Sequence, residues 1–296
     1  FNSDMAKPLT SIEAKEKIGV AAGGTFFPEG GWVNLQQACK DVFEELLPEQ
    51  KSWVTEVKSI QRSKEGWQIY GSDNYLIATS KRLFLAGGLA VKDLAKSAGI
   101  DLPLKPVRGQ LSRFRFSKDS SWDQAKPKVA LSGKAYCLPP QMLADDQYEW
   151  VVGSSYDEEV EDLNVWPESH DENRALIKEM LNQQLVNSEL KPVGAFVGIR
   201  CVASDRLPIM GPVLNKPGLY ILTSLGSRGV MWSALASQMF TEHLAEELHH
   251  SAFFDARFLA GARLAAAGLT ADLAGALLAA RFLAGASNSK PIFPSA

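Results

Sequence analysis

The clearest pattern of hydrophobic and polar positions lies in the last third of the chain, where a strand, a glycine turn and a helix follow one another. Residues 219–222 form a short apolar run between Gly218 and Gly226, which is typical of a strand that begins at Gly218. After the turn at 226–229, apolar residues recur at helical spacing to about Leu248. Such a turn directs backbone N–H groups and the positive end of the helix dipole towards an anion. Glycines that merely allow a positive φ are an equally good interpretation of this turn.

The same order of elements occurs earlier in the chain. Between residues 53 and 86 the hydrophobic period changes from 3.6 towards 2, which predicts four short strands, at 54–60, 67–70, 75–78 and 83–86. The last of them runs into Gly87-Gly88 and then into an apolar segment at 89–98. The N–H groups of this second turn are therefore also candidates to face a ligand.

Two further helices are indicated by apolar residues at helical spacing. One covers residues 35–46, with Asn34 at its N-cap and Gln37 in the capping-box place. The other runs from about 171 to 185, with a charged face opposite its apolar one. Strands dominate elsewhere, and they are expected at 107–116, 129–131, 136–138, 150–154 and 193–200.

These elements predict a mixed α/β (α+β) chain with an inserted antiparallel sheet. Residues 1–105 and 201–250 are expected to form one domain, which a sheet domain at 106–200 interrupts. The segment 251–296 is rich in Ala and Leu and is interpreted as a helical tail with two short helices.

Composition and charge narrow the function classes. With 46% hydrophobic and 22% charged residues, the chain is typical of a soluble globular protein. The net charge of −3 argues against a dedicated basic nucleic-acid module, although it leaves room for a local basic face. The three cysteines have no metal-ligand spacing, and the absence of a signal or membrane-span pattern favours the cytoplasm. Because the chain starts at Phe1 in a polar run, we interpret it as a fragment whose N-terminal part is missing.

Several catalytic signatures are missing from the sequence. It contains no phosphate-binding P-loop, no zinc-protease His-Glu-x-x-His, no Gly-x-Ser-x-Gly and no Gly-x-Gly-x-x-Gly. His249 and His250 stand beside Glu246 and Glu247, but a solvated helix end is the better interpretation of that group than a metal site. No metal is expected.

Six short motifs resemble a known family when they are taken in order. They are Gly23–Val33, Val107–Gln110, Gly153–Asp157, the pair His170 and Asn173, Gly198–Pro212 and Gly218–Gly229. In this order they resemble the C-terminal FAD-dependent oxidoreductase domain of the bifunctional enzyme that makes 5-methylaminomethyl-2-thiouridine in tRNA. That domain belongs to the D-amino-acid-oxidase-like (glycine/sarcosine oxidase) flavoprotein superfamily. The resemblance covers roughly residues 19–250 and is most specific from Arg200 to Gly229.

The resemblance implies a partial Rossmann-like FAD-binding domain with a β-meander and an inserted antiparallel substrate sheet. The methyltransferase domain and the first βαβ unit, with its pyrophosphate loop, are expected upstream of this chain. FAD is the implied cofactor, and the backbone of Val57 would meet its adenine. Two turns would approach the cofactor, and their residues are Ala86, Gly87, Gly88, Gly226, Ser227, Arg228, Gly229 and Val230. The second turn would present N–H groups where reduction leaves negative charge on the flavin.

The reaction implied by the resemblance is oxidation of the carboxymethylaminomethyl group on the wobble uridine of tRNA. Hydride passes from the methylene carbon to flavin N5, and water hydrolyses the imine to a primary amine and glyoxylate. The substrate carboxylate calls for an Arg and a hydroxyl, and the candidates are Arg200, Tyr136 and Tyr156. Arg200 could instead pair with Asp205, and each tyrosine could be a core aromatic.

Two other functions remain open at this point. One is an FAD-dependent oxidase or dehydrogenase of free glycine, sarcosine or D-amino acids. The other is a truncated, non-catalytic remnant or tRNA-docking module, which the missing pyrophosphate loop favours. For the same reason, the chain alone is expected to hold FAD weakly.

Overall fold

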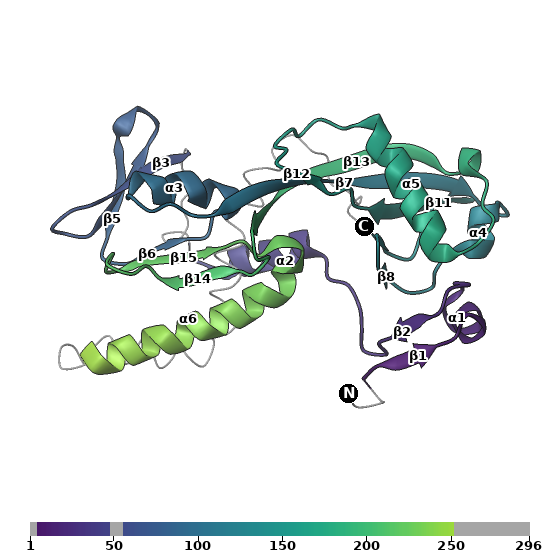
Figure 1. Ribbon diagram of the computed structural model, residues 1–296, viewed down its shortest axis with the longest axis horizontal. Coiled ribbons are helices and arrows are strands. Elements are labelled where there is room, and N and C mark those ends of the chain that lie inside the picture. The colour runs from purple at the N-terminus through teal and green to yellow at the C-terminus, as the bar shows by residue number, and fades with distance from the viewer. Residues whose placement is uncertain (1–4, 48–55, 252–296) are drawn as a thin grey trace. The chain divides into compact units, whose positions relative to one another are not determined.

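The computed structural model describes residues 5–47 and 56–251 (Figure 1). The described chain divides into two compact units. The first consists of residues 5–33 and 107–199, and the second consists of residues 34–47, 56–106 and 200–251. Each unit has its own hydrophobic core.

A seven-stranded sheet dominates the first unit, in the order β12-β7-β11-β9-β8, with β10 paired to β11 and β13 paired to β7. The strands are β7 (Leu104–Ser117), β8 (Leu131–Ser132), β9 (Tyr136–Cys137), β10 (Gln141–Met142), β11 (Gln147–Gly153), β12 (Asp157–Glu158) and β13 (Lys191–Ala203). Antiparallel pairing of β7 with β11 sets Phe114 opposite Trp150. Because side chains alternate along a strand, the aromatic residues of both strands share one face of the sheet.

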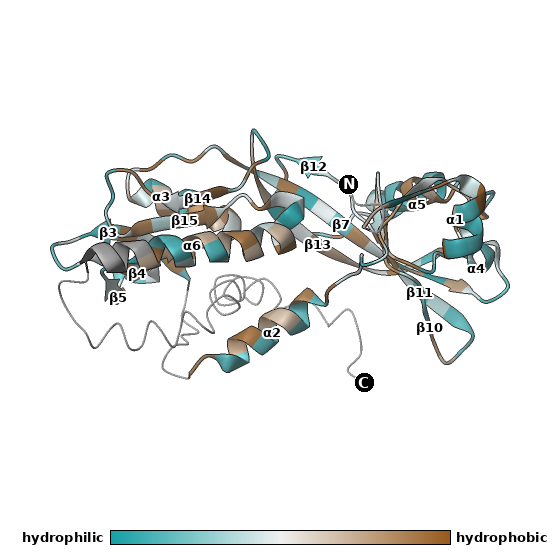
Figure 2. Ribbon diagram, turned by 90° about the horizontal axis from the view of Figure 1, so that it is seen from below, coloured by the Kyte–Doolittle hydropathy of each residue, from teal (hydrophilic) through white to brown (hydrophobic). Residues whose placement is uncertain are grey.

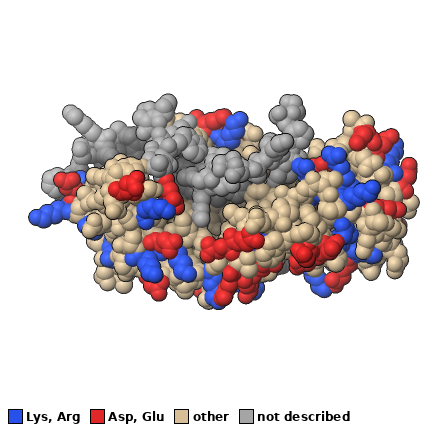
Figure 3. All heavy atoms as spheres, turned by 90° about the horizontal axis from the view of Figure 1, so that it is seen from above, with Lys and Arg blue, Asp and Glu red and all other residues tan. Residues whose placement is uncertain are grey.

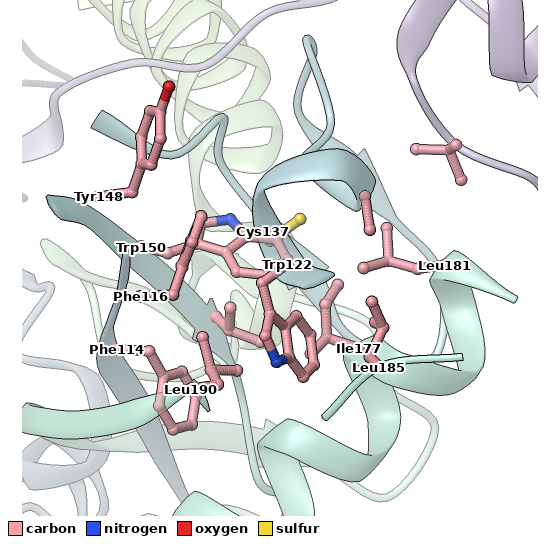
Figure 4. Packing of buried hydrophobic residues seen from close by; sticks show 13 residues of the cluster. Phe114, Phe116, Trp122, Cys137, Tyr148, Trp150, Ile177, Leu181, Leu185 and Leu190 are labelled. Atoms are coloured by element: carbon pink, nitrogen blue, oxygen red, sulfur yellow. The ribbon is translucent and has the colours of Figure 1, made fainter. Parts of the chain in front are cut away.

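Two helices cover that aromatic face, α4 (Ser121–Ala125) and α5 (Pro167–Leu181) (Figure 4). Ile177 and Leu181 of α5 are fully buried one helical turn apart. The buried indoles of Trp122 and Trp150 donate their N–H groups to the carbonyls of Val186 (2.8 Å) and Leu138 (2.6 Å). The aromatic core is therefore buried without leaving an indole donor unpaired.

The predicted helix at 171–185 lies too far along the chain by one turn. The helix begins at Pro167, a favourable first helical residue, and ends because Asn182 adopts a left-handed conformation with φ of 51°. Leu185 lies beyond the helix but is still buried in the same cluster. Because the helical spacing of apolar residues continues to Leu185, the predicted C-terminal end of this helix was wrong.

The N-terminal part of the first unit also forms regular structure. It contains β1 (Lys7–Leu9), α1 (Ser11–Ile18) and β2 (Gly24–Phe26), and β1 pairs with β2 in a two-stranded sheet. A reciprocal capping box between Thr10 and Glu13 starts α1.

The second unit contains two three-stranded sheets. One is an antiparallel meander of β3 (Val57–Arg62), β4 (Trp67–Gly71) and β5 (Leu76–Ser80). The other has the order β14-β15-β6 and consists of β14 (Ile209–Pro212), β15 (Leu219–Thr223) and β6 (Leu83–Leu85). The four strands predicted between 54 and 86 are all present, but the fourth leaves the meander. Its first residue, Leu83, donates its N–H to the carbonyl of Gly218 (2.8 Å), so β6 pairs in parallel with β15 instead.

The helices of the second unit follow the sequence pattern closely. They are α2 (Leu35–Glu45), α3 (Val91–Ser97) and α6 (Gly229–Ser251). Asn34 caps α2 as predicted, but the Gln37 side chain bonds Asp41, so only half of the expected capping box forms. Figure 2 shows both brown and teal on α2, as an amphipathic helix requires. No helix in the described ranges is both long and apolar enough to cross a membrane.

The predicted tail at 251–296 lies outside the described residues from residue 252 onwards. The side chains of His249, His250, Glu246 and Glu247 are also outside the described part of the structure.

Gly218 does more than begin a strand. Its φ is +78°, and a Cβ added there would lie 2.2 Å from the carbonyl oxygen of Lys81. We expect Gly218→Ala to lower the free energy of unfolding by about 2 kcal/mol, since left-handed backbone strain and a backbone clash act together. Urea titration of the variant measures this, with Gly31→Ala as control, because a Cβ at Gly31 meets nothing within 4 Å. Equal midpoints for the two variants would contradict the structural reason.

Candidate functional site

Two glycine turns lie at the same edge of the β14-β15-β6 sheet. Strands β6 and β15 are parallel neighbours, with Phe84 opposite Tyr220, so their carboxyl ends meet at one edge. Ala86 and Gly87 follow β6 and lead through the 3-10 turn η3 (Gly88–Ala90) into α3. After β15, the 3-10 turn η5 (Gly226–Arg228) leads directly into α6. The structure therefore brings together the two turns that the sequence singled out separately.

The buried side chain of Thr223 joins these two turns. Its hydroxyl donates a hydrogen bond to the carbonyl oxygen of Gly88 (2.8 Å), and the residue is only 1% exposed. The Sγ atom of Cys201 lies 3.4 Å from the same hydroxyl. Since Thr223 ends β15 and Gly88 begins η3, this contact fixes one turn against the other.

The next residue, Ser224, fixes the second turn against β13 and the segment that follows it. Its hydroxyl accepts a hydrogen bond from the N–H of Ala203 (2.7 Å) and donates one to the carbonyl of Leu207 (2.9 Å). Ser224 has a φ of +59°. These hydrogen bonds hold an uncommon backbone conformation immediately before η5.

Both turns present backbone N–H groups. Within the described residues, no side chain caps η3, α3 or η5, and the first N–H groups of a helix have no partner within it. Gly88 and Gly226 have φ of +61° and +55°, whereas Gly229 is helical with φ of −53°. A Cβ added at Gly87 or Gly229 would meet no atom closer than 3.8 Å. Open backbone donors at a helix start suit an anionic or electron-rich ligand.

The remaining predicted cofactor residues also lie in the second unit. Val57 begins β3 opposite Gly71, and the pairing register shifts between Val57 and Ser59. Ser227, Arg228 and Val230 are exposed at the start of α6. The contact of each residue with a cofactor stays a prediction.

A buried guanidinium organises the loop between β11 and α5 in the first unit. Arg108 is 0% exposed. Its Nη1 donates to the Asp157 carboxylate (2.9 Å), its Nη2 to Oε1 of Gln110 (2.9 Å), and its Nε to the carbonyl of Asp162 (2.9 Å). The guanidinium also lies over the Trp166 ring, 3.9 Å from its centre. This set of contacts compensates the cost of removing the charge from water.

The same network joins three of the motifs that carry the family resemblance. The carbonyl oxygen of Gln110 accepts hydrogen bonds from the N–H of Ser155 (3.2 Å) and from Nδ2 of Asn173 (2.9 Å). The Ser155 hydroxyl accepts from the Gln110 N–H and donates to Asp157. Residues 108–110, 153–157 and 170–173 therefore form one contiguous polar cluster, which no local pattern in the sequence indicates.

His170 completes this cluster through Ser112. Its Nδ1 lies 2.9 Å from the Ser112 hydroxyl, and that hydroxyl accepts a hydrogen bond from Asn173 (2.9 Å). Burial, and then the charge of Arg174, hold the pKa of His170 below its usual value. A neutral imidazole that accepts the Ser112 proton fits these contacts, so we assign His170 a structural part.

The three residues predicted to bind the substrate carboxylate belong to different units. Tyr136 lies on β9 opposite Gly153, and Tyr156 lies between two residues of the Arg108 network. Both tyrosines are about two fifths exposed, at 41% and 43%. Arg200 lies half-buried on β13, in the second unit. Both tyrosines thus belong to the first unit and Arg200 to the second. Binding of the substrate carboxylate by these three residues stays a prediction.

Sequence reasoning missed a charged group on the face of the sheet opposite the aromatic core. Arg113 and Arg115 alternate with buried Phe114 and Phe116 along β7. Their Nε atoms lie 3.3 Å and 3.2 Å from the two carboxylate oxygens of Glu149. The alternation of Arg and Phe at 113–116 was the available signal.

The cysteines do not supply a nucleophile or a metal site in the described part of the chain. Cys39, Cys137 and Cys201 are free thiols and all three are buried. Burial raises the pKa of Cys137 to about 12. Within the described residues, no group of three or more potential metal ligands is found.

The Arg108 network predicts a large difference between two arginines of the same strand. Arg108→Lys should lower the free energy of unfolding by about 2 kcal/mol or more, because an ammonium cannot satisfy the planar set of buried acceptors. Arg115→Lys is the control, because its side chain is 42% exposed, and the expected change is within about 0.5 kcal/mol. Urea unfolding of both variants measures the difference. A tolerated Arg108→Lys would show that the network does not hold the loop.

Comparison with known proteins identifies the family. Residues 4–243 match the family described as FAD dependent oxidoreductase (DAO). The chain is 29% identical over 272 residues to the tRNA 5-methylaminomethyl-2-thiouridine biosynthesis bifunctional protein MnmC of Ectopseudomonas mendocina, covering 82% of this chain and 39% of that protein. It is 28% identical over 251 residues to the protein of the same name from Idiomarina loihiensis, covering 84% and 39%. The chain thus spans about two fifths of the length of these relatives.

Solved structures show the same fold at low sequence identity. The glycine oxidase from Bacillus cereus matches 80% of this chain and 65% of its own with a TM-score of 0.61 and 19% identity. The glycine oxidase from Geobacillus kaustophilus matches 98% and 65% with a TM-score of 0.58 and 16% identity. From its match over residues 4–243, the chain belongs to the DAO family of FAD-dependent oxidoreductases.

Proposed function

We propose that the chain catalyses FAD-dependent oxidation of the carboxymethylaminomethyl group on the wobble uridine of tRNA. The secondary amine R–CH2–NH–CH2–COO⁻ loses two electrons and two protons at the N–CH2 bond next to the carboxylate. Addition of water then yields the primary amine R–CH2–NH2 and glyoxylate. The observation that carries this proposal is the match to curated relatives named for 5-methylaminomethyl-2-thiouridine biosynthesis in tRNA, along most of this chain.

The residues at the sheet edge fit FAD. Two uncapped helix starts lie side by side there, and Thr223 fixes them to each other. We assign the backbone of Gly87, Gly88 and 226–230 to the cofactor, and that of Val57 to its adenine. Bound FAD supplies the two-electron oxidation. The N–H groups at the start of α6 would stabilise negative charge on it without reorganising, because the backbone holds them in place.

Orientation of the substrate is the main task left to the side chains. A carboxylate held by the two-point fork of Arg200 would keep the adjacent methylene in a fixed position. Tyr136 and Tyr156 stay proposed hydroxyl donors to the substrate. For Tyr156, the hydrogen bonds of its neighbours Ser155 and Asp157 support this proposed role, because they hold the chain in place on both sides of the tyrosine.

The proposal extends to the setting of the reaction. The relatives are called bifunctional and are longer than this chain, so we place the oxidoreductase beside a methyltransferase domain in a longer protein. We also propose that the reaction takes place in the cytoplasm, as expected for a tRNA substrate.

Product analysis tests the proposed function. The FAD-loaded protein is incubated either with tRNA that carries carboxymethylaminomethyluridine or with glycine, sarcosine and D-amino acids. Release of glyoxylate from the tRNA together with a new aminomethyluridine supports the proposal. Peroxide release from free amino acids, with the tRNA unchanged, would make the chain an amino-acid oxidase. No turnover of any substrate by FAD-loaded protein would favour a non-catalytic docking module.

The link between the two turns gives a prediction on cofactor binding. Thr223→Val keeps the side-chain shape but leaves the Gly88 carbonyl without its donor. We expect the Kd for FAD to rise about fivefold, which corresponds to a loss of about 1 kcal/mol of binding free energy. Fluorescence titration of FAD measures the change. The matched control is Thr241→Val, whose hydroxyl donates to the Ser237 carbonyl one helical turn away (2.8 Å). The same FAD affinity in both variants would contradict the link.

Arg200 is tested separately from the cofactor. Arg200→Lys should lower kcat/KM on modified tRNA by about tenfold or more, because an ammonium offers a point charge in place of a two-point fork. FAD content should stay unchanged. The control is Arg206→Lys, a change in the exposed turn after β13. If the Arg200→Lys variant melts at a lower temperature but keeps normal kinetics, Arg200 braces the turn and does not hold the substrate.

A further inference from the structure

A basic groove lies at the other end of the β6 and β15 strands, away from the glycine turns. Its volume is about 440 Å³, and it is formed by the β5–β6 turn, the β14–β15 turn and the last residue of β3. Four cationic residues line it: Arg62, Lys81, Arg82 and Lys216. None of the described residues that line it carries a carboxylate. The groove therefore gathers positively charged side chains from three separate segments of the second unit.

This concentration of positive charge does not follow from the overall composition. The chain has 31 basic and 34 acidic residues, and the face drawn in Figure 3 carries both signs side by side. In the part of the chain that the structure describes, Arg62, Lys81 and Lys216 form no ion pair. A cleft that gathers cations without ion pairs, here Arg62, Lys81 and Lys216, attracts anions more strongly than scattered surface charges do.

Close backbone contacts hold the floor of the groove in place. Gly218 approaches the Lys81 carbonyl so closely that any Cβ would clash, and its own carbonyl accepts the N–H of Leu83. The Trp67 indole donates to the carbonyl of Pro217 (3.0 Å), and Arg62 lies 5.6 Å from the centre of the Trp67 ring. The cationic side chains thus project from a preorganised surface, which lowers the cost of binding a ligand there.

The groove is separate from the proposed cofactor site. It adjoins the amino ends of β6 and β15, while the glycine turns follow their carboxyl ends. A five-residue strand spans about 17 Å at the rise of a β-strand, so an anion in the groove is not the phosphate of a cofactor bound at the turns.

We propose that this groove binds the sugar-phosphate backbone of the tRNA substrate. The inference rests on the proposed function and names a second contact region for the same substrate. The cationic side chains Arg62, Lys81 and Arg82 are exposed, and contacts of this kind position a nucleic acid without reading its sequence. A polymeric anion reaches both the groove and the reacting base, whereas a small amino-acid substrate does not. An open row of cations also fits a chain of phosphates better than one enclosed phosphate.

Charge removal in the groove tests this proposal. The double variant Lys81→Ala/Lys216→Ala should bind unmodified tRNA about tenfold more weakly at low salt. The slope of log affinity against log salt concentration should become shallower by about 1 to 2. Fewer phosphates are neutralised without the two lysines, so fewer counterions are released when the tRNA binds. Fluorescence anisotropy of labelled tRNA over a series of KCl concentrations measures both quantities. The control is Lys40→Ala/Lys118→Ala, which removes the same charge from lysines paired with Glu44 and Asp146.

Each outcome decides the matter. Unchanged tRNA affinity and salt slope in the groove variant, or equal losses in the control, would overturn the proposal. Weaker binding of inorganic phosphate with unchanged tRNA binding would make the groove a small-anion site and would also overturn it. Equal FAD content and melting temperature in both variants exclude misfolding as the cause of a loss.

A kinetic measurement separates this inference from the proposed function. If both are correct, the groove variant shows a raised KM for modified tRNA and an unchanged kcat. If only the proposed reaction is correct, glyoxylate release is the same in the variant and the parent protein. If the proposed reaction is wrong, no glyoxylate appears with any variant, and the tRNA titration still gives its own answer.

Discussion

The parallel pairing of β6 with β15 is the constraint on which both proposed functional regions of the second unit depend. It joins residues 83–85 to residues 219–221, which are far apart in the chain. At the carboxyl ends of these strands it sets two glycine turns beside each other, and the Thr223 hydroxyl locks them together. At the amino ends it packs Gly218 against Lys81 and so builds the floor of a basic groove. One strand pairing therefore organises the proposed cofactor site at one end and the basic groove at the other.

The first unit depends on a buried charge in a comparable way. A guanidinium at 0% exposure is tolerated only because carboxylate, amide and carbonyl oxygens surround it. The contacts of Arg108 with residues 157–164 order the loop in which Tyr156 lies. A flexible loop would lose conformational entropy each time it met a substrate, whereas this one is already ordered by its own hydrogen bonds. The family motifs around residues 108, 155 and 173 are thus explained by packing, and Tyr156, which is 43% exposed, stays a proposed substrate contact.

Sequence patterns predicted the elements whose formation depends on residues close together in the chain. The buried strand at 219–222, the Asn34 cap and the helices after both glycine turns follow from apolar spacing and turn residues, and all of them are present. The fourth strand at 83–86 could not be assigned to a sheet, because its partner lies more than a hundred residues away. The constraint on Gly218 could not be predicted for the same reason, since the carbonyl that excludes a Cβ belongs to Lys81. The Arg108 network was visible only as separate motifs. The candidate cofactor residues came from the family resemblance, and the structure adds how their turns are held.

The central claim is that FAD in this protein is reduced by the modified base of a tRNA. The direct measurement is anaerobic rapid mixing of the FAD-loaded protein with tRNA that carries carboxymethylaminomethyluridine, followed through the visible absorption of the flavin. The account predicts bleaching of the flavin at a rate no slower than turnover, with one glyoxylate formed for each flavin reduced. Flavin that stays oxidised with this tRNA but bleaches with glycine or sarcosine would contradict it.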